Sequence, residues 1–148
     1  MKKAIRIMMV LFILSLAACG DSDDGGALEE APEASPTEAE ASVSFTSPED
    51  GDTVASSVKV AMEAEGITIE PAANGVRDGA GHLHIMIDTD CLAEGEAIPN
   101  DDTHKHYGMA QTEAELVLAP GEHELCLQAG NGAHSALPIT DKISITVE

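Results

Sequence analysis

The sequence has very few aromatic residues: its 148 residues include no Trp, one Tyr and two Phe. A folded core built from this chain must therefore be aliphatic and thin. Basic residues are also scarce, with seven Lys and Arg against 27 Asp and Glu, which gives a formal net charge of −20 at pH 7. A surface this acidic repels nucleic acid and anionic lipid, so we expect no nucleic-acid partner.

The first residues lack an apolar run long enough to span a bilayer, because Ile7–Leu16 is only about half of the roughly 20 residues required. A basic start, this short apolar run and small residues before Cys19 are typical of a secretory signal. The order resembles a bacterial lipobox, so we predict a lipoprotein signal peptide over residues 1–18 and acyl chains such as palmitate on Cys19. The alternative is an ordinary signal peptide that happens to contain Cys19.

The next segment, residues 19–42, contains many Asp, Glu, Ala and Pro residues and no basic ones. It has too little apolar surface to offset the entropy of ordering the chain, so we predict an acidic disordered linker. Together with lipidation, it would hold a domain away from a membrane. We therefore expect a location in the cell envelope, on the outer membrane facing the periplasm or on the cell surface, with the membrane bound through the lipid and any protein partner unknown.

From residue 43 onward, short segments alternate apolar and polar residues between turns rich in Gly, Pro and Asn. Val58, Val60 and Met62, for example, share one face of an extended chain. No stretch shows helical periodicity. About seven such segments predict one domain, residues 43–148, folded as an immunoglobulin-like antiparallel β-sandwich. The segments we predict to be extended are 43–46, 57–64, 67–70, 82–89, 103–108, 112–118, 122–129 and 142–147, with an irregular link at 134–138.

Cysteine is also rare, and only Cys91 and Cys126 remain in the predicted domain. An even pair in an exported chain favours a disulfide, because exported proteins meet an oxidising compartment. In the chain-entropy model such a bridge stabilises the fold by about 3–4 kcal/mol. The competing interpretation is a pair of free thiols that bind a metal. A disulfide would leave histidine and methionine as the candidate ligands.

Four of the six histidines form two His-x-His pairs, His82 with His84 and His104 with His106. Residues two apart on a strand face the same side, so each pair can point at one place. Met86 lies on the face of the first pair. Imidazole suits zinc and copper, and an added thioether favours copper. We predict a copper or zinc site formed by His82, His84, His104, His106, His134 and Met86, where His134 joins only if its loop folds back.

A second interpretation of the histidines is structural, because imidazoles in an aliphatic sheet can simply form hydrogen bonds that brace it. His123, between two Glu residues on a late strand, is expected to lie at an edge or on the surface. Catalysis is the weakest alternative, since the sequence contains no nucleophile elbow, P-loop or dinucleotide-binding glycine motif. A metal-dependent hydrolase would need an open metal position and a nearby carboxylate base. We therefore predict a binding module with no catalytic residue.

Several motifs resemble those of a bacterial family of exported proteins, the domain of unknown function 4399. They are Gly81-His82-x-His84 with Asp88, Ile98-Pro99-x-Asp101-x-x-His104-x-His106-Tyr107-Gly108, Gln111-Thr112-Glu113, Pro120-Gly121-Glu122-His123-x-Leu125 and the Gly-x-His ending at His134. The resemblance covers about residues 43–148 and implies a small, secreted or lipid-anchored β-sandwich. It implies no activity. Met109-Ala110 replaces a Gly-rich step of the family pattern.

Overall fold

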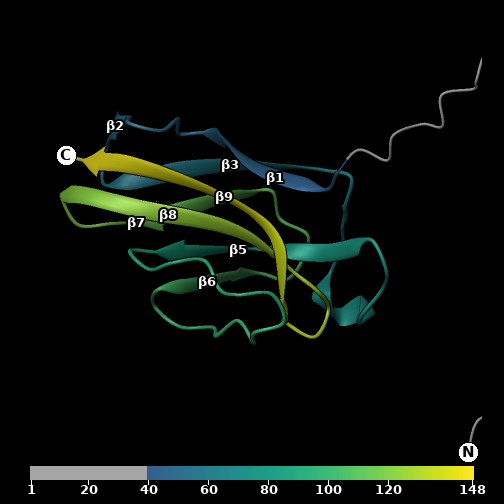
Figure 1. The fold of residues 1–148 in the computed structure, drawn as a ribbon. Helices are drawn as coiled ribbons and strands as arrows, with labels where there is room; N and C mark the ends of the chain where they lie inside the picture. Colours follow the sequence, from purple (N-terminus) through teal and green to yellow (C-terminus); the bar gives the residue numbers. More distant parts are fainter. Residues whose placement is uncertain (1–39) are drawn as a thin grey trace, which may run out of the picture. The chain divides into compact units, whose positions relative to one another are not determined.

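The computed structural model describes residues 40–148, which form a domain of β-strands (Figure 1). The predicted signal peptide, the lipidation at Cys19 and the linker up to residue 39 lie outside the described residues. In the described part no helix is long and apolar enough to cross a membrane. The elements are β1 Ser42–Ser47, β2 Thr53–Val54, β3 Ser57–Glu65, β4 Thr68–Ile69, the 3₁₀ turn η1 Ala72–Asn74, β5 Ala80–Ile87, β6 His104–Tyr107, β7 Glu113–Val117, β8 Gly121–Gly130 and β9 Ala136–Val147.

The strands form two sheets that pack as an immunoglobulin-like β-sandwich. One sheet has the order β1-β3-β7, and the other has the order β2-β9-β8-β5-β4, with β6 also paired to β5. Every pair between longer strands is antiparallel, whereas the two-residue strands β2 and β4 pair in parallel with β9 and β5. The predicted fold class is therefore confirmed, with two short parallel pairs added.

An aliphatic core fills the space between the sheets, as the scarcity of aromatic residues requires. Val58 and Val60 of β3 face Leu125 and Leu127 of β8 in one cluster, and each of these side chains is at most 2% exposed. Their period-two spacing is what places them all inward, since successive side chains of a strand point to opposite faces. The core thus confirms the alternation read from these segments.

Strand β5 is buried on both faces, and the two faces have different chemistry. Leu83, Ile85 and Ile87 pack into the aliphatic core between the sheets. The opposite face carries His82, His84 and Met86, and all three are 0% exposed. Because the second face lies outside the sandwich, the loop of residues 88–103 and the turn before β9 must cover it.

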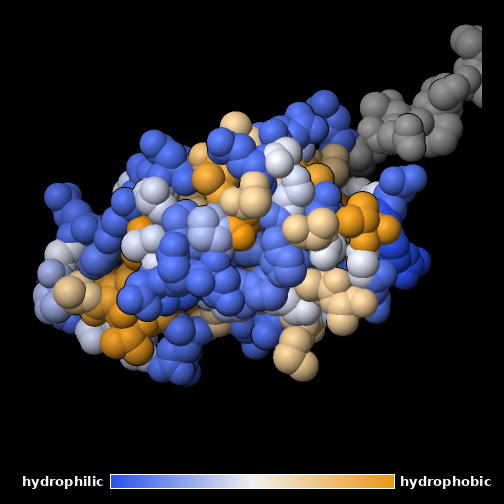
Figure 2. All heavy atoms as spheres, turned by 90° about the horizontal axis from the view of Figure 1, so that it is seen from below, coloured by the Kyte–Doolittle hydropathy of each residue, from blue (hydrophilic) through white to orange (hydrophobic). Residues whose placement is uncertain are grey.

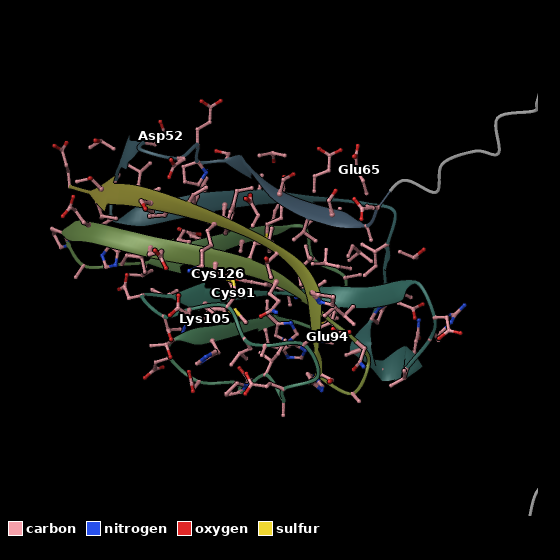
Figure 3. All side chains as sticks on the ribbon, viewed as in Figure 1. Asp52, Glu65, Cys91, Glu94, Lys105 and Cys126 are labelled. Carbon is pink, nitrogen blue, oxygen red and sulfur yellow. A yellow bond between two sulfur atoms is a disulfide. The ribbon has the colours of Figure 1, made fainter. Side chains whose placement is uncertain are left out.

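The covering loop is tied to β8 by covalent and polar contacts. Cys91 and Cys126 form the predicted disulfide, with Cα atoms 5.7 Å apart (Figure 3). The amide of the buried Gln128 accepts a hydrogen bond from Leu92 N at 2.9 Å and donates to Leu92 O at 2.8 Å. Seen from the β6 side, this part of the molecule is mostly hydrophilic with separate hydrophobic patches (Figure 2).

The end of the chain is more regular than its sequence indicates. We predicted an irregular link over 134–138 and a strand from Lys142, but β9 begins at Ala136 and runs to Val147. Its first half pairs with the last residues of β8 across an irregularity between Gln128 and Gly130. The prediction was wrong here because Pro138 and the polar residues after it hide the alternation, whereas the partner strand supplies the pairing.

Candidate metal centre

Three histidines converge on the outer face of the larger sheet. His82 and His84 come from β5, and His106 comes from β6, where the strand register places it opposite His84. Their ligand nitrogens all lie within 4.8 Å of one another. Among residues 40–148, no carboxylate or thiolate belongs to this group. The register of two antiparallel strands therefore brings together one histidine pair and half of the other.

A fourth imidazole comes from His134, in the turn between β8 and β9. His134 Nε2 lies 3.1 Å from His106 Nε2. The backbone of His134 has a φ of 59°, which is uncommon for a residue with a side chain. Asn131 shapes this turn, since its carbonyl accepts from His134 N at 2.8 Å and its side-chain oxygen accepts from Ala133 N and Ser135 N. The loop folds back, as the prediction required.

All four rings are mutual neighbours, and the four residues are called the tetrad from here on. The six distances between ring centroids run from 4.6 Å for His82–His84 and for His106–His134 to 6.1 Å for His84–His134. Inner and outer members differ in exposure, because His82 and His84 are fully buried while His106 and His134 are partly exposed. Any ligand must therefore enter from the side of His106 and His134.

The inner pair has polar atoms without protein partners. Within the part of the chain that the structure describes, none of the four ring nitrogens of His82 and His84 has a hydrogen-bond partner. Each such buried group costs about 1–3 kcal/mol when it is left unsatisfied. A buried polar group in a native protein is normally hydrogen-bonded, so these nitrogens indicate that the site holds something other than protein.

Burial and crowding lower the pKa of three histidines of the tetrad, His82, His84 and His106. Desolvation, and then repulsion from His106 and His134, lower the pKa of His82 from 6.5 to about 4. The pKa of His84 falls to about 3, again mainly through desolvation and then through His82; the Gln128 backbone, outside hydrogen-bonding geometry, opposes this slightly. The pKa of His106 is lowered by the same two effects. Neutral imidazole is the form that binds a metal ion.

Two glycines make room for the rings. A Cβ added at Gly130 would lie 2.7 Å from His84 Cε1, closer than real contacts allow, and one at Gly108 would overlap the His106 ring. Sequence reasoning assigned both glycines to turns or strand ends and missed this role. The available signal was a glycine at the end of an alternating strand, which often marks a close approach.

Two of the predicted ligands lie elsewhere. His104 faces Met86 across the register rather than His84, and its Nδ1 lies 2.9 Å from Asp101 Oδ1. Met86 packs with Ile98, Cys126 and Ala136 in a small apolar cluster beside the disulfide. His123 lies partly exposed on β8, where its Nδ1 is 2.8 Å from Asp88 Oδ2. The structure thus brings together His82, His84, His106 and His134, and it does not bring His104 to them.

The tetrad fits a transition metal better than other cations. Imidazole nitrogen suits zinc and copper, whereas magnesium and calcium take oxygen ligands. In a tetrahedral zinc site with bonds of about 2.0–2.1 Å, ligand nitrogens lie about 3.3 Å apart. The 3.1 Å between Nε2 of His106 and Nε2 of His134 is close to that value, and the ligand nitrogens of His82, His84 and His106 lie within 4.8 Å of one another.

The family profile described as Domain of unknown function (DUF4399) matches residues 60–148. No curated protein matches the chain. Among solved structures, the chain is similar to the fibronectin(III)-like modules of Clostridium thermocellum CbhA, with 17% identity and a TM-score of 0.43 over 72% of this chain and 95% of that one. It is also similar to the endo-beta-1,4-mannanase from Thermotoga petrophila, with 17% identity and a TM-score of 0.44 over 74% of this chain and 20% of that one.

Proposed function

The chain belongs to the DUF4399 family, whose function is unknown, and we propose that it is a cell-envelope lipoprotein that binds a transition metal, copper or zinc. The metal is held by His82, His84 and His106, with His134 beside them. The proposed role is that of a binding module, in which the histidines act as ligands.

One observation carries this proposal: the buried ring nitrogens of His82 and His84 have no partner among the described residues, yet they lie in a group of converging imidazoles. A metal ion would bind nitrogen lone pairs that otherwise stay unsatisfied. The lowered pKa values support the same conclusion, because the imidazoles remain neutral and able to coordinate at neutral pH.

The alternative role, a hydrogen-bonded cluster that braces the sheet, is favoured by one contact. His106 and His134 lie within hydrogen-bond distance of each other, so one ring can donate to the other without a metal. A bracing role does not explain why the ring nitrogens of His82 and His84 are unpaired among the described residues, since a bracing residue stabilises the fold only through the hydrogen bonds that it makes. The two roles differ in whether removal of the histidines abolishes metal binding.

The proposed location follows from the N-terminal sequence. The lipobox-like order ending at Cys19 would anchor the chain in the membrane through its acyl chains, because two or more chains give stable anchoring. The acidic domain would then stand in an oxidising compartment, where the Cys91–Cys126 disulfide persists.

Calorimetric titration of the full chain in detergent with Zn(II), Cu(II) and Cu(I) tests the proposal. We expect at least one ion to bind with a Kd below about 10 μM, a free energy of roughly −7 kcal/mol. The variant His84→Ala/His106→Ala should lose this binding. The matched control His104→Ala/His123→Ala also removes two histidines, but from outside the tetrad, and should keep it. Equal binding by the two double variants, or no binding by the wild type, would refute the proposal.

A further inference from the structure

The separations of the four rings indicate which geometry a bound ion would adopt. Resting on the proposed metal-binding function, we infer that the site is a closed, tetrahedral centre for Zn(II), in which His134 is the fourth ligand. The trio of His82, His84 and His106 alone would leave one coordination position open to water. A fourth ligand from His134 would close the site, as in structural zinc sites. Catalytic zinc sites instead keep that position open.

The ring separations distinguish a tetrahedron from a square. With zinc-type bonds, four imidazole centroids at the corners of a tetrahedron are all about 5 Å apart, whereas a square gives two opposite pairs at about 6.4 Å. In the tetrad only His84–His134, at 6.1 Å, approaches the longer value, and the complementary pair His82–His106 is 4.9 Å apart. The other four distances run from 4.6 to 5.2 Å. Copper(II) and nickel(II) favour the square arrangement, and zinc favours the tetrahedral one.

The position of His134 is held from both sides. Its N–H donates to Asn131 O at 2.8 Å, and its own carbonyl accepts from Ile98 N at 2.8 Å. Its left-handed φ of 59° costs energy that the surrounding turn must offset. A strained backbone of this kind persists where it holds a side chain in a particular position. Here it places Nε2 of His134 3.1 Å from Nε2 of His106.

The donor set also selects the ion. Copper(I) favours thiolate and thioether ligands, but Cys91 and Cys126 are joined in the disulfide and Met86 packs in the apolar cluster beside it. Four imidazole ligands leave the charge of a divalent ion intact, and the formal net charge of −20 on the chain favours the approach of a cation.

Cobalt(II) reports the geometry, because tetrahedral Co(II) absorbs visible light far more strongly than five- or six-coordinate Co(II). The full chain in detergent is titrated with Co(II), and then Zn(II) is added to displace it. We expect strong visible bands that disappear as Zn(II) binds. Weak bands, with Cu(II) bound in a square arrangement by electron paramagnetic resonance, would overturn the tetrahedral inference and leave the proposed metal binding intact. Binding of none of these ions would overturn both.

The variant His134→Gly removes the imidazole without straining the turn, because glycine adopts the left-handed conformation freely. We expect the bands to weaken and the Zn(II) affinity to fall by at least about 100-fold, the upper end of what loss of a supporting residue costs. The control Ala110→Gly replaces another residue of positive φ, 62°, outside the tetrad and should change neither. Unchanged bands and affinity in His134→Gly would show a three-histidine site and refute the closed centre.

Discussion

Among the residues, the glycines beside the imidazoles leave the space that the rings of the tetrad occupy. Gly130 lies at the end of β8, where an added Cβ would come 2.7 Å from His84 Cε1 and 3.0 Å from Ile98 Cδ1. We expect Gly130→Ala to destabilise the domain by about 1–3 kcal/mol, the usual cost of overpacking a close-packed site. Urea unfolding of the metal-free chain measures this loss.

A double-mutant cycle assigns that loss to the imidazole. In a His84→Ala background the ring is absent, so Gly130→Ala should cost less, by a coupling energy of about 0.5–3 kcal/mol. Strictly additive losses would mean that the glycine is required for some reason other than space for His84.

The buried pair also predicts how stability depends on pH. His82 and His84 have folded-state pKa values of about 4 and about 3, below the ordinary 6.5, so the unfolded chain binds more protons in between. Their contribution is therefore present above pH 6.5 and is lost as the pH falls, by up to about 1.4 kcal/mol per pH unit for each histidine. Urea midpoints with a chelator present should drop between pH 6.5 and 5.

The variant His82→Gln/His84→Gln should show a shallower drop over this range. His123→Gln serves as the control, because the Ala119 carbonyl and then Asp88 raise the pKa of His123, so its contribution is lost in the other direction, as the pH rises. If the first variant retains the full slope, these two histidines are protonated in the folded protein.

The sequence pattern predicted only part of the candidate site. The same-face rule correctly paired His82 with His84, but it also paired His104 with His106. It could not show that the register sets His106 opposite His84 and His104 opposite Met86. His134 lies in a turn that Asn131 shapes locally, but its contact with Ile98 joins residues far apart in the sequence, and no local pattern indicates that contact.

Among the elements, the loop of residues 88–103 acts as a covalently braced cover for the tetrad. The Cys91–Cys126 bridge closes 35 residues, and the loop then pairs with the turn of His134 through Ile98 N and through Glu96 O, which accepts from Ala136 N at 2.8 Å. We expect Cys91→Ser/Cys126→Ser to lower stability by about 3–4 kcal/mol and to weaken zinc binding as well. Urea unfolding and zinc titration measure the two effects.

A control variant must separate a general loss of stability from the specific loss of the disulfide. Leu116 is 3% exposed on β7 in the other sheet, and Leu116→Ala should cost a comparable 2–5 kcal/mol, about the range for such core truncations. The folded Leu116→Ala variant should bind zinc as the wild type does. If both variants lose affinity equally, the disulfide has no specific role in positioning His134.

Strands were easier to predict than the connections between them. Alternation identified β3, β5, β7 and β8, because each has one face in the aliphatic core and the hydrophobic effect enforces the period. The two-residue strand β2 and the first half of β9 were missed, since their pairing depends on distant partners rather than on their own residues.

At the scale of the whole molecule, we propose that a lipid anchor at Cys19 tethers a metal-binding domain. If Cys19 carries the acyl chains, cells grown with labelled palmitate should label the wild-type chain and leave Cys19→Ser unlabelled. The control Cys91→Ser/Cys126→Ser removes the other two cysteines and should retain the label. Label on Cys19→Ser would contradict the lipoprotein proposal while leaving the metal centre untouched.

The central claim is that the tetrad of His82, His84, His106 and His134 holds a metal ion. A crystal structure of the zinc-loaded protein, with anomalous data collected on both sides of the zinc absorption edge, tests it most directly. We predict one anomalous peak amid the four rings, about 2.0–2.1 Å from one nitrogen of each. No peak there, with the ring nitrogens of His82 and His84 hydrogen-bonded to backbone or water, would contradict the claim and establish the histidines as a structural brace.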